Sequence, residues 1–121
     1  MDRNLKLMSG WNLKSKISKV DLTGKWKYKE DYGYGVAEGE LFLKQEGNDL
    51  SGRIIFTDKL DGEDGYMLQE FLVGRLEEHK VKLDAEEFDI IHSEHEIEYE
   101  LDSWFGILVD ADTIVGVSKD G

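Results

Sequence analysis

The sequence predicts an all-β protein, a single antiparallel up-and-down β-barrel of about eight strands. Three observations support this fold class: apolar and polar residues alternate along short segments, gaps of hairpin length separate the segments, and glycines recur inside them. Alternation with a period of two places successive side chains on opposite faces of a strand. From Leu22 onward no segment has the apolar spacing of a helix, so we expect strands and turns there.

Five glycines have an apolar residue two places before and two places after them. A glycine inside a strand marks a bend, a bulge or a close approach of backbones, and repeated bends let a sheet coil and close. The intervals of 15, 13, 22, 32 and 10 residues are too irregular for duplicated units, so we interpret the pattern as curvature. The copies are centred on Gly24, Gly39, Gly52, Gly74 and Gly106, and Gly116 keeps half of the pattern.

The alternation places each expected strand, and glycine-rich or acidic turns bound it. In the first strand Trp26 and Tyr28 share one face, and the lysines on the other face are expected to meet outward glutamates of the second strand. The seventh begins at Glu96 with the cleanest alternation in the chain and changes phase near Asp102. The expected strands are residues 25–29, 38–45, 50–57, 66–76, 79–85, 88–92, 96–102 with its continuation from 104, and 113–118.

Closure of the sheet is expected because an open meander of this length exposes two strand edges to aggregation. A two-sheet sandwich is the alternative architecture. The domain that closes covers residues 22–121, and residues 1–21 are expected to be a basic leader that packs on it. Gly10 interrupts any long helix in this leader, so we expect a short helix or an irregular segment across one end of the barrel.

The charge of the chain is −12 and is unevenly distributed. Residues 1–29 hold eight Lys/Arg against two Asp/Glu, whereas residues 30–121 hold seven Lys/Arg against 25 Asp/Glu. An acidic body repels phosphate backbones and anionic lipids, so we expect neither nucleic acid nor a membrane as a partner. A basic protein partner fits the sign of the charge.

The composition contains no cysteine, which excludes disulfides, thiolate metal sites and a cysteine nucleophile. The longest apolar run, Phe105 to Val109, is far too short for a membrane helix. The first residues contain no secretory signal pattern, so the cytoplasm is the default expectation for this chain.

The strand that opens the barrel resembles a known family. Gly24-Lys25-Trp26 is similar to the Gly-x-Trp signature of lipocalins and related calycins. The hairpin from Leu41 to Gly52 and the last strand from Thr113 to Ser118 resemble those of small bacterial lipocalin-like domains. The resemblance implies a barrel that in its relatives often holds a small apolar molecule. The Thr-Asp-Tyr motif of lipocalins is absent, because Thr57-Asp58-Lys59 lacks the tyrosine, and no ligand-binding residue is carried over.

Metal, cofactor and catalytic patterns are weak. His92 and His95 lie near Glu94 and Glu96, but two surface histidines at a hairpin tip are the simpler interpretation. The acidic loop from Asp58 to Gly65 does not match the calcium-hand spacing in either alignment of its glycines. No nucleophile elbow, phosphate loop or dinucleotide fingerprint is present, so we expect no metal, no cofactor and no catalytic residue.

Aromatic residues on the strands are the remaining candidates for binding. If they point inward, they either fill the barrel or line a pocket. The residues expected to hold a ligand are Tyr28, Phe56, Phe71, Tyr99 and Trp104. Two functions follow from the sequence: non-enzymatic binding of a small apolar or aromatic molecule, or an acidic interaction module of the immunity or inhibitor type that binds a basic protein partner.

Overall fold

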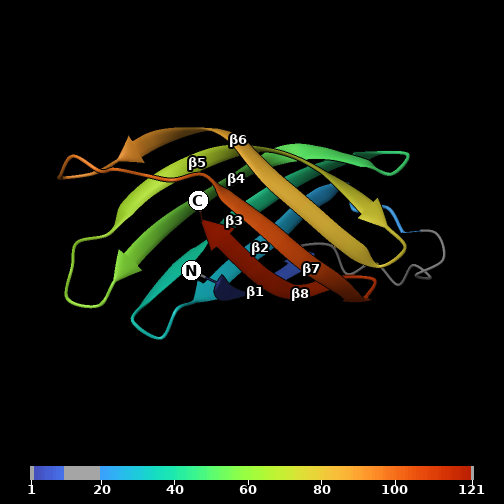
Figure 1. Ribbon diagram of the computed structural model, residues 1–121, viewed down its shortest axis with the longest axis horizontal. Helices are drawn as coiled ribbons and strands as arrows, with labels where there is room; N and C mark the ends of the chain where they lie inside the picture. Colours follow the sequence, from blue (N-terminus) through green and yellow to red (C-terminus); the bar gives the residue numbers. More distant parts are fainter. Residues whose placement is uncertain (1, 10–19, 121) are drawn as a thin grey trace.

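The computed structural model describes residues 2–9 and 20–120 of the chain as one antiparallel sheet that closes into a barrel (Figure 1). Each strand pairs with the next in sequence, and the first also pairs with the last. The predicted all-β, up-and-down barrel is therefore confirmed. In the described part of the chain there is no helix with the length and apolarity that a membrane crossing requires. The strands are β1 (Asp2–Ser9), β2 (Gly24–Asp31), β3 (Gly35–Glu46), β4 (Asp49–Leu60), β5 (Tyr66–Glu77), β6 (Lys80–His92), β7 (Asp102–Asp110) and β8 (Thr113–Asp120).

The start of the chain is part of the barrel, which corrects the expectation of a helical or irregular leader. Asn4 of β1 lies opposite Asp31 of β2 on one side and Val117 of β8 on the other. β1 supplies a ladder partner to two strand edges that are otherwise open, and this closes the sheet. The division into a leader of residues 1–21 and a barrel of residues 22–121 therefore cuts through the sheet. The rest of the predicted leader, residues 10–19, lies outside the described residues.

The glycine pattern marks the inner surface of the barrel. In all six copies the residues two before and two after the glycine are buried, so each of these glycines occupies an inward position between two core residues. A Cβ atom at Gly39 or at Gly74 would lie 1.9 Å from a backbone carbonyl oxygen of the adjacent strand. Glycine is required at these two positions because the neighbouring backbone occupies the space of a side chain.

The outer surfaces of β2 and β3 carry the predicted pairs of opposite charge. Lys29 lies directly across from Glu38, and their side-chain atoms Nζ and Oε1 are 3.8 Å apart. Lys25 forms an ion pair with Glu40 on the same face. These contacts confirm the register expected from the alternation of the two strands.

Two details of β6 and β7 differ from the expectation. The strands predicted at residues 79–85 and 88–92 form one strand, β6, in which a bulge absorbs the change of phase: Leu72 pairs with Ala85, but Phe71 pairs with Glu87. Residues 96–101 are not a strand, because β7 begins at Asp102. Residues 96–101 keep the alternation of exposed and partly buried side chains, but they are not a strand because no neighbouring strand pairs with them in the described part of the chain.

Candidate functional site

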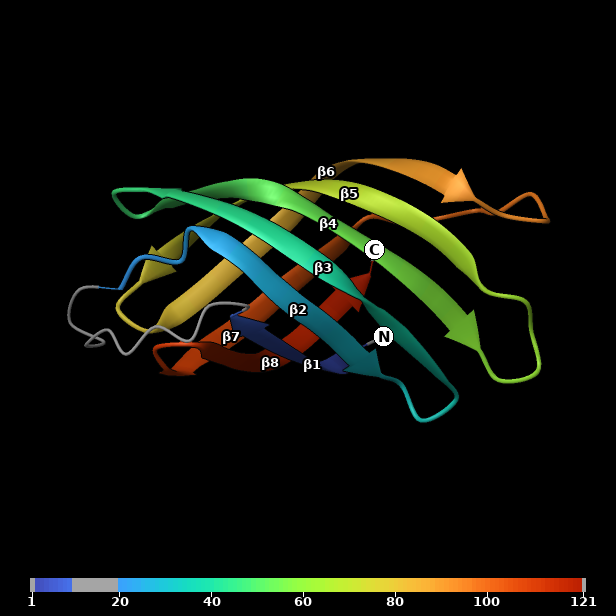
Figure 2. The same cartoon turned by 180° about the vertical axis from the view of Figure 1, so that it is seen from behind.

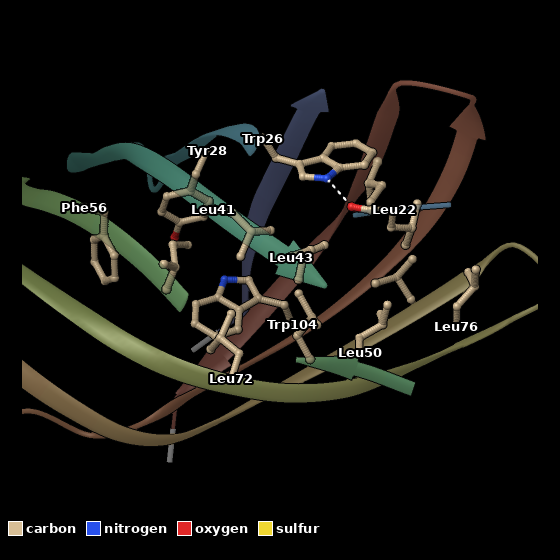
Figure 3. Close-up of a cluster of buried hydrophobic side chains, with 14 of the residues drawn as sticks. Leu22, Trp26, Tyr28, Leu41, Leu43, Leu50, Phe56, Leu72, Leu76 and Trp104 are labelled. Atoms are coloured by element: carbon tan, nitrogen blue, oxygen red, sulfur yellow. Dashed lines mark hydrogen bonds between the residues drawn. The ribbon is translucent and has the colours of Figure 1, made fainter. Parts of the chain in front are cut away.

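Three of the five predicted ligand-binding residues lie together inside the barrel. Tyr28, Phe56 and Trp104 are all buried, and the Tyr28 ring meets the other two edge to face, at centroid distances of 5.4 Å to Phe56 and 6.5 Å to Trp104. Figure 3 shows Tyr28 and Trp104 among the leucines that fill the interior. The space between Tyr28, Trp104 and their neighbours Leu41, Ile54, Leu72 and Leu83 has no room for a water molecule. This part of the barrel is a packed core.

The other two residues lie elsewhere. Phe71 is 38% exposed on the outer surface of β5, so the expectation that it points inward is wrong. Leu72, the next residue, takes the inner position, and successive side chains of a strand face opposite sides. Tyr99 is half-buried in the connection from β6 to β7, where it contacts Phe88. A ligand-binding role for any of the five residues remains a prediction.

A buried carboxyl group, Glu30 of β2, joins three strands inside the barrel. It accepts hydrogen bonds from the hydroxyl of Tyr28, from Nε1 of Trp104 at 2.9 Å and from Oγ of Ser118 at 2.6 Å. Glu30 has no exposed surface, and a buried carboxyl requires such donors. Glu30 was not among the residues predicted from the sequence, although it continues the inward alternation of Trp26 and Tyr28.

A second buried group, which we name the Tyr99 latch, consists of Glu70, Tyr99 and Asp102. The Tyr99 hydroxyl contacts Oε1 of Glu70 and Oδ2 of Asp102, and the Asp102 backbone N–H donates to Oε2 of Glu70 at 3.3 Å. One hydroxyl proton satisfies only one of the two tyrosine contacts, so the other requires a proton on a carboxyl group. The latch fastens the β6–β7 connection to β5.

The electrostatics of the Tyr99 latch assign that proton to Glu70. Burial, followed by the negative charge and the hydrogen bond of Asp102, raises the pKa of Glu70 to about 9. Burial and the two neighbouring carboxyl groups also raise the pKa of Tyr99 far above its ordinary value. At neutral pH the latch therefore holds a protonated Glu70 and a neutral tyrosine. The alternation of β5 places Glu70 inward, between Leu68 and Leu72, which was the available sequence signal.

An acidic cleft of about 640 Å³ opens at the end of the barrel where β4 turns into β5 and β6 connects to β7. Of the residues that the structure describes, five carboxylate side chains and neither lysine nor arginine line this cleft. The acidic residues are Glu63, Asp64, Glu94, Glu96 and Glu98. Along the sequence, residues 83–118 hold eleven Asp/Glu and no Lys or Arg, so no cation from this stretch neutralises the cleft.

His95 lines this cleft and forms part of a turn, whereas His92 is the last residue of β6. The hydroxyl of Ser93 donates to the carbonyl oxygen of His95 at 2.6 Å, and the backbone N–H of His95 returns a hydrogen bond to that hydroxyl. Among the described residues, no group of three or more His, Asp or Glu side chains is arranged to hold a metal ion.

The sheet is incomplete beside the acidic cleft. β6 pairs with β5 along its whole length, as far as His92 opposite Met67, but it pairs with β7 only from Lys80 to Asp84. Within the described part of the chain, the connecting residues 96–101 belong to no ladder. In both ribbon views the outer half of β6 and this connection extend to the same end of the molecule (Figures 1 and 2). Strand edges are therefore exposed at the acidic end.

A groove of about 730 Å³ crosses the outer surface of β6, β7 and β8. Its floor includes Phe105, Ile107, Val115 and Val117, each at least 36% exposed. Charged residues of both signs surround it, namely Arg75, Glu77, Lys80, Lys82 and Asp84. Exposed apolar surface of this kind marks interaction or ligand sites.

Comparisons with known proteins do not identify a function for this chain, so a functional proposal depends on the geometry described above. No family model, no curated protein and no solved structure matches this chain. The antiparallel barrel agrees with the architecture that the lipocalin resemblance implied.

Proposed function

We propose that this barrel is a non-enzymatic interaction domain that binds a basic protein through its acidic end. The observation that carries the proposal is the acidic cleft, which among the described residues is lined by five carboxylates from two connections and by no lysine or arginine. Complementary charge of this kind accelerates association and selects partners.

The distribution of ion pairs supports this surface. On the side of β2 to β5, exposed carboxylates have cations from the same chain close by: Glu40 has Lys25, Glu46 has Lys44 at 2.8 Å, and Asp49 has Arg75 at 3.0 Å. Within the described part of the chain, no lysine or arginine lines the acidic cleft. Its negative potential is therefore available to a partner.

The packed interior also favours a surface function. The aromatic residues expected to hold a small molecule surround a space too small for water at Tyr28 and Trp104. Ligand pockets typically enclose about 300 to 1,000 Å³. A partner that binds the outer surface requires no such volume.

Binding of a small apolar or aromatic molecule is the second candidate function, and the outer groove favours it. The groove volume of about 730 Å³ falls in the range of ligand pockets, and its floor is apolar. Native mass spectrometry of the protein purified from its own host tests this candidate. A retained small molecule that is lost in an Ile107→Lys variant supports it, and a ligand-free wild-type protein opposes it.

We also propose that the chain is a divergent relative of the lipocalin-like barrels. Trp26 of the Gly-x-Trp pattern donates from Nε1 to the carbonyl oxygen of Leu22 at 2.9 Å (Figure 3). Leu22 is fully buried, and its backbone N–H donates to Gln45 Oε1 at 2.9 Å. The segment that precedes β2 thus covers one end of the barrel, which supports the resemblance.

Zero-length cross-linking tests the proposed function. A carbodiimide joins carboxylates directly to lysines, so a basic partner in a lysate of the native host becomes coupled to the acidic cleft. The test variant is Glu94→Gln/Glu96→Gln/Glu98→Gln, and the control Glu38→Gln/Glu46→Gln/Glu77→Gln changes the net charge equally at exposed sites outside the cleft.

We expect cross-links at Glu63 and Asp64 of the cleft, whose carboxylates are kept in all three proteins, to form in the wild type, to persist in the control and to fall by about tenfold or more in the test variant. The proposal is wrong if the two variants lose cross-links equally, because the charge of the whole protein then explains them. It is also wrong if the coupled lysines come only from acidic proteins.

A further inference from the structure

The β6–β7 connection has the side-chain arrangement of a strand but lacks its ladder. Along residues 96–101 the side chains of Glu96, Glu98 and Glu100 are exposed, while the intervening Ile97, Tyr99 and Leu101 are partly buried. Within the described part of the chain these residues pair with no strand. Extended backbone of this kind presents unpaired N–H and C=O groups to an incoming chain.

The segment is held in place by side chains. The Tyr99 latch attaches its C-terminal half to β5 through Glu70, and the Tyr99 ring packs on Phe88 of β6 with centroids 5.1 Å apart. An incoming strand therefore meets a fixed template and does not have to order it first. Such preorganisation lowers the entropic cost of binding.

We propose that residues 96–101 are the receptor strand for an extended basic segment of a partner protein, which adds to the sheet by main-chain hydrogen bonds. This inference rests on the proposed function and names its site and its partner class. Strand addition of this type draws affinity from the backbone and specificity from alternate side chains.

Charge selects the occupant. The exposed face of the segment carries Glu96, Glu98 and Glu100, and the opposite wall of the acidic cleft carries Glu63 and Asp64. Opposite charges stabilise cross-strand pairs, and like charges destabilise them. The incoming strand therefore carries lysine or arginine at alternate positions. A second copy of this chain does not fit, because its own residues 96–101 would oppose acid with acid.

The test uses an alternating lysine–threonine octapeptide with blocked ends and a fluorescent label. Its comparison peptide has the same sequence, but the amide nitrogens at alternate residues are methylated, which removes the main-chain donors of one edge and keeps every charge. We expect the wild-type protein to bind the first peptide and to bind the methylated peptide about tenfold or more weakly. Fluorescence anisotropy measures both affinities.

Amide hydrogen exchange provides a second measurement that requires no variant. With the unmethylated peptide bound, the amides of residues 96–101 should exchange more slowly, while those of β2 and β3 keep their rates. The variant Glu96→Gln/Glu98→Gln/Glu100→Gln should weaken binding about tenfold, and the control Glu38→Gln/Glu46→Gln/Glu77→Gln should change it less than twofold.

The outcomes separate this inference from the proposed function. Equal affinity for the two peptides, or no protection of residues 96–101, overturns strand addition, and the cross-linking result still decides the function. If the peptide does not bind at all, strand addition is overturned as well. If the Glu96 variant and the control weaken binding equally, both proposals fail together.

Discussion

The side of the barrel built from β2, β3 and β4 and the end where β6 leaves β7 use the same ingredients differently. In the first region, pairing is continuous from Gly35 opposite Leu60 to Glu46 opposite Asp49, and lysines face glutamates across the strands. In the second, pairing stops at Asp84, and the exposed side chains of residues 85–100 carry no cation. Figure 2 shows the first region in front, and Figure 1 shows β6, β7 and β8 in front.

The difference teaches that this sheet uses charge for two purposes. Where cations alternate with carboxylates, the pairs help to hold the strand register. Where carboxylates are alone, they repel other acidic strands, which protects the exposed edge from copies of the same chain. In the proposed strand addition, this repulsion favours a basic chain over a second copy of the protein.

The largest expected effect comes from removing the carboxyl group that joins the regular side to β7 and β8. Glu30→Ala leaves donors of Tyr28, Trp104 and Ser118 buried without their acceptor and opens a cavity, so the free energy of unfolding should fall by about 3 to 5 kcal/mol. Urea denaturation measures it. The exposed control Glu38→Ala should lose less than about 0.5 kcal/mol. Equal losses would mean that Glu30 does not join the strands.

The next effect compares an inward glycine of the regular side, Gly39 of β3, with an inward glycine of β7, Gly106. A Cβ at Gly39 would lie 1.9 Å from the Ile55 carbonyl oxygen, whereas at Gly106 the nearest atom is a side-chain methyl of Ile114 at 2.6 Å. Backbone yields less readily than a side chain, so Gly39→Ala should destabilise by about 3 kcal/mol and Gly106→Ala by about 1 to 2 kcal/mol. Denaturation midpoints check the order. The reverse order would mean that the neighbouring side chain of Ile114 resists a new Cβ atom more strongly than the neighbouring backbone of Ile55 does.

The third effect is a pH dependence that comes from Glu70, at the open end. The pKa of Glu70 rises from 4.5 to about 9 on folding, so between these values the native state binds the extra proton. The contribution of Glu70 to stability is therefore fully present below pH 4.5 and is lost as the pH rises toward 9.

The expected loss is about 1 kcal/mol per pH unit in the middle of this window. The contribution of Glu70 is isolated by measuring the free energy of unfolding of the wild type and of Glu70→Gln from pH 6 to pH 9, because the neutral amide of glutamine cannot titrate. The slope should flatten in the variant. Parallel slopes in the two proteins would show that Glu70 is ionised in the Tyr99 latch.

The smallest effect concerns the surface ion pairs. A double-mutant cycle on Lys25 and Glu40 should give a coupling free energy below about 1 kcal/mol that decreases at high salt, since both side chains are about half exposed. A coupling of several kcal/mol would mean that the charge pairs of the regular side do more than support its register.

The sequence predicted the barrel because its alternation and its inward glycines are local signals. Trp26 and Tyr28 alternate with lysines, and both are buried as expected. It did not predict β1, since the apolar residues of the leader resembled a packing segment and its pairing partners lie at opposite ends of the chain. Phe71 was misplaced because aromatic character does not determine which face of a strand a residue occupies.

Of the candidate site, only the negative charge could be predicted from the sequence. The acidic character of residues 83–118 is readable directly, but the acidic cleft requires the β4–β5 turn to lie opposite the β6–β7 connection. The Tyr99 latch brings together Glu70 and Asp102, which are 32 positions apart, and no motif announces such a contact.

By itself the sequence determined the all-β fold class, the apolar neighbours on both sides of the recurring glycines and the sign of the charge, because each depends on residue type and on spacing over a few positions. The tertiary structure alone decided that β1 closes the barrel, that the space between Tyr28 and Trp104 is filled and that residues 96–101 lie extended without a ladder. These outcomes depend on which distant strands meet and on how much volume their side chains occupy. Local alternation of apolar and polar residues predicts neither the pairing of distant strands nor the volume that their side chains fill.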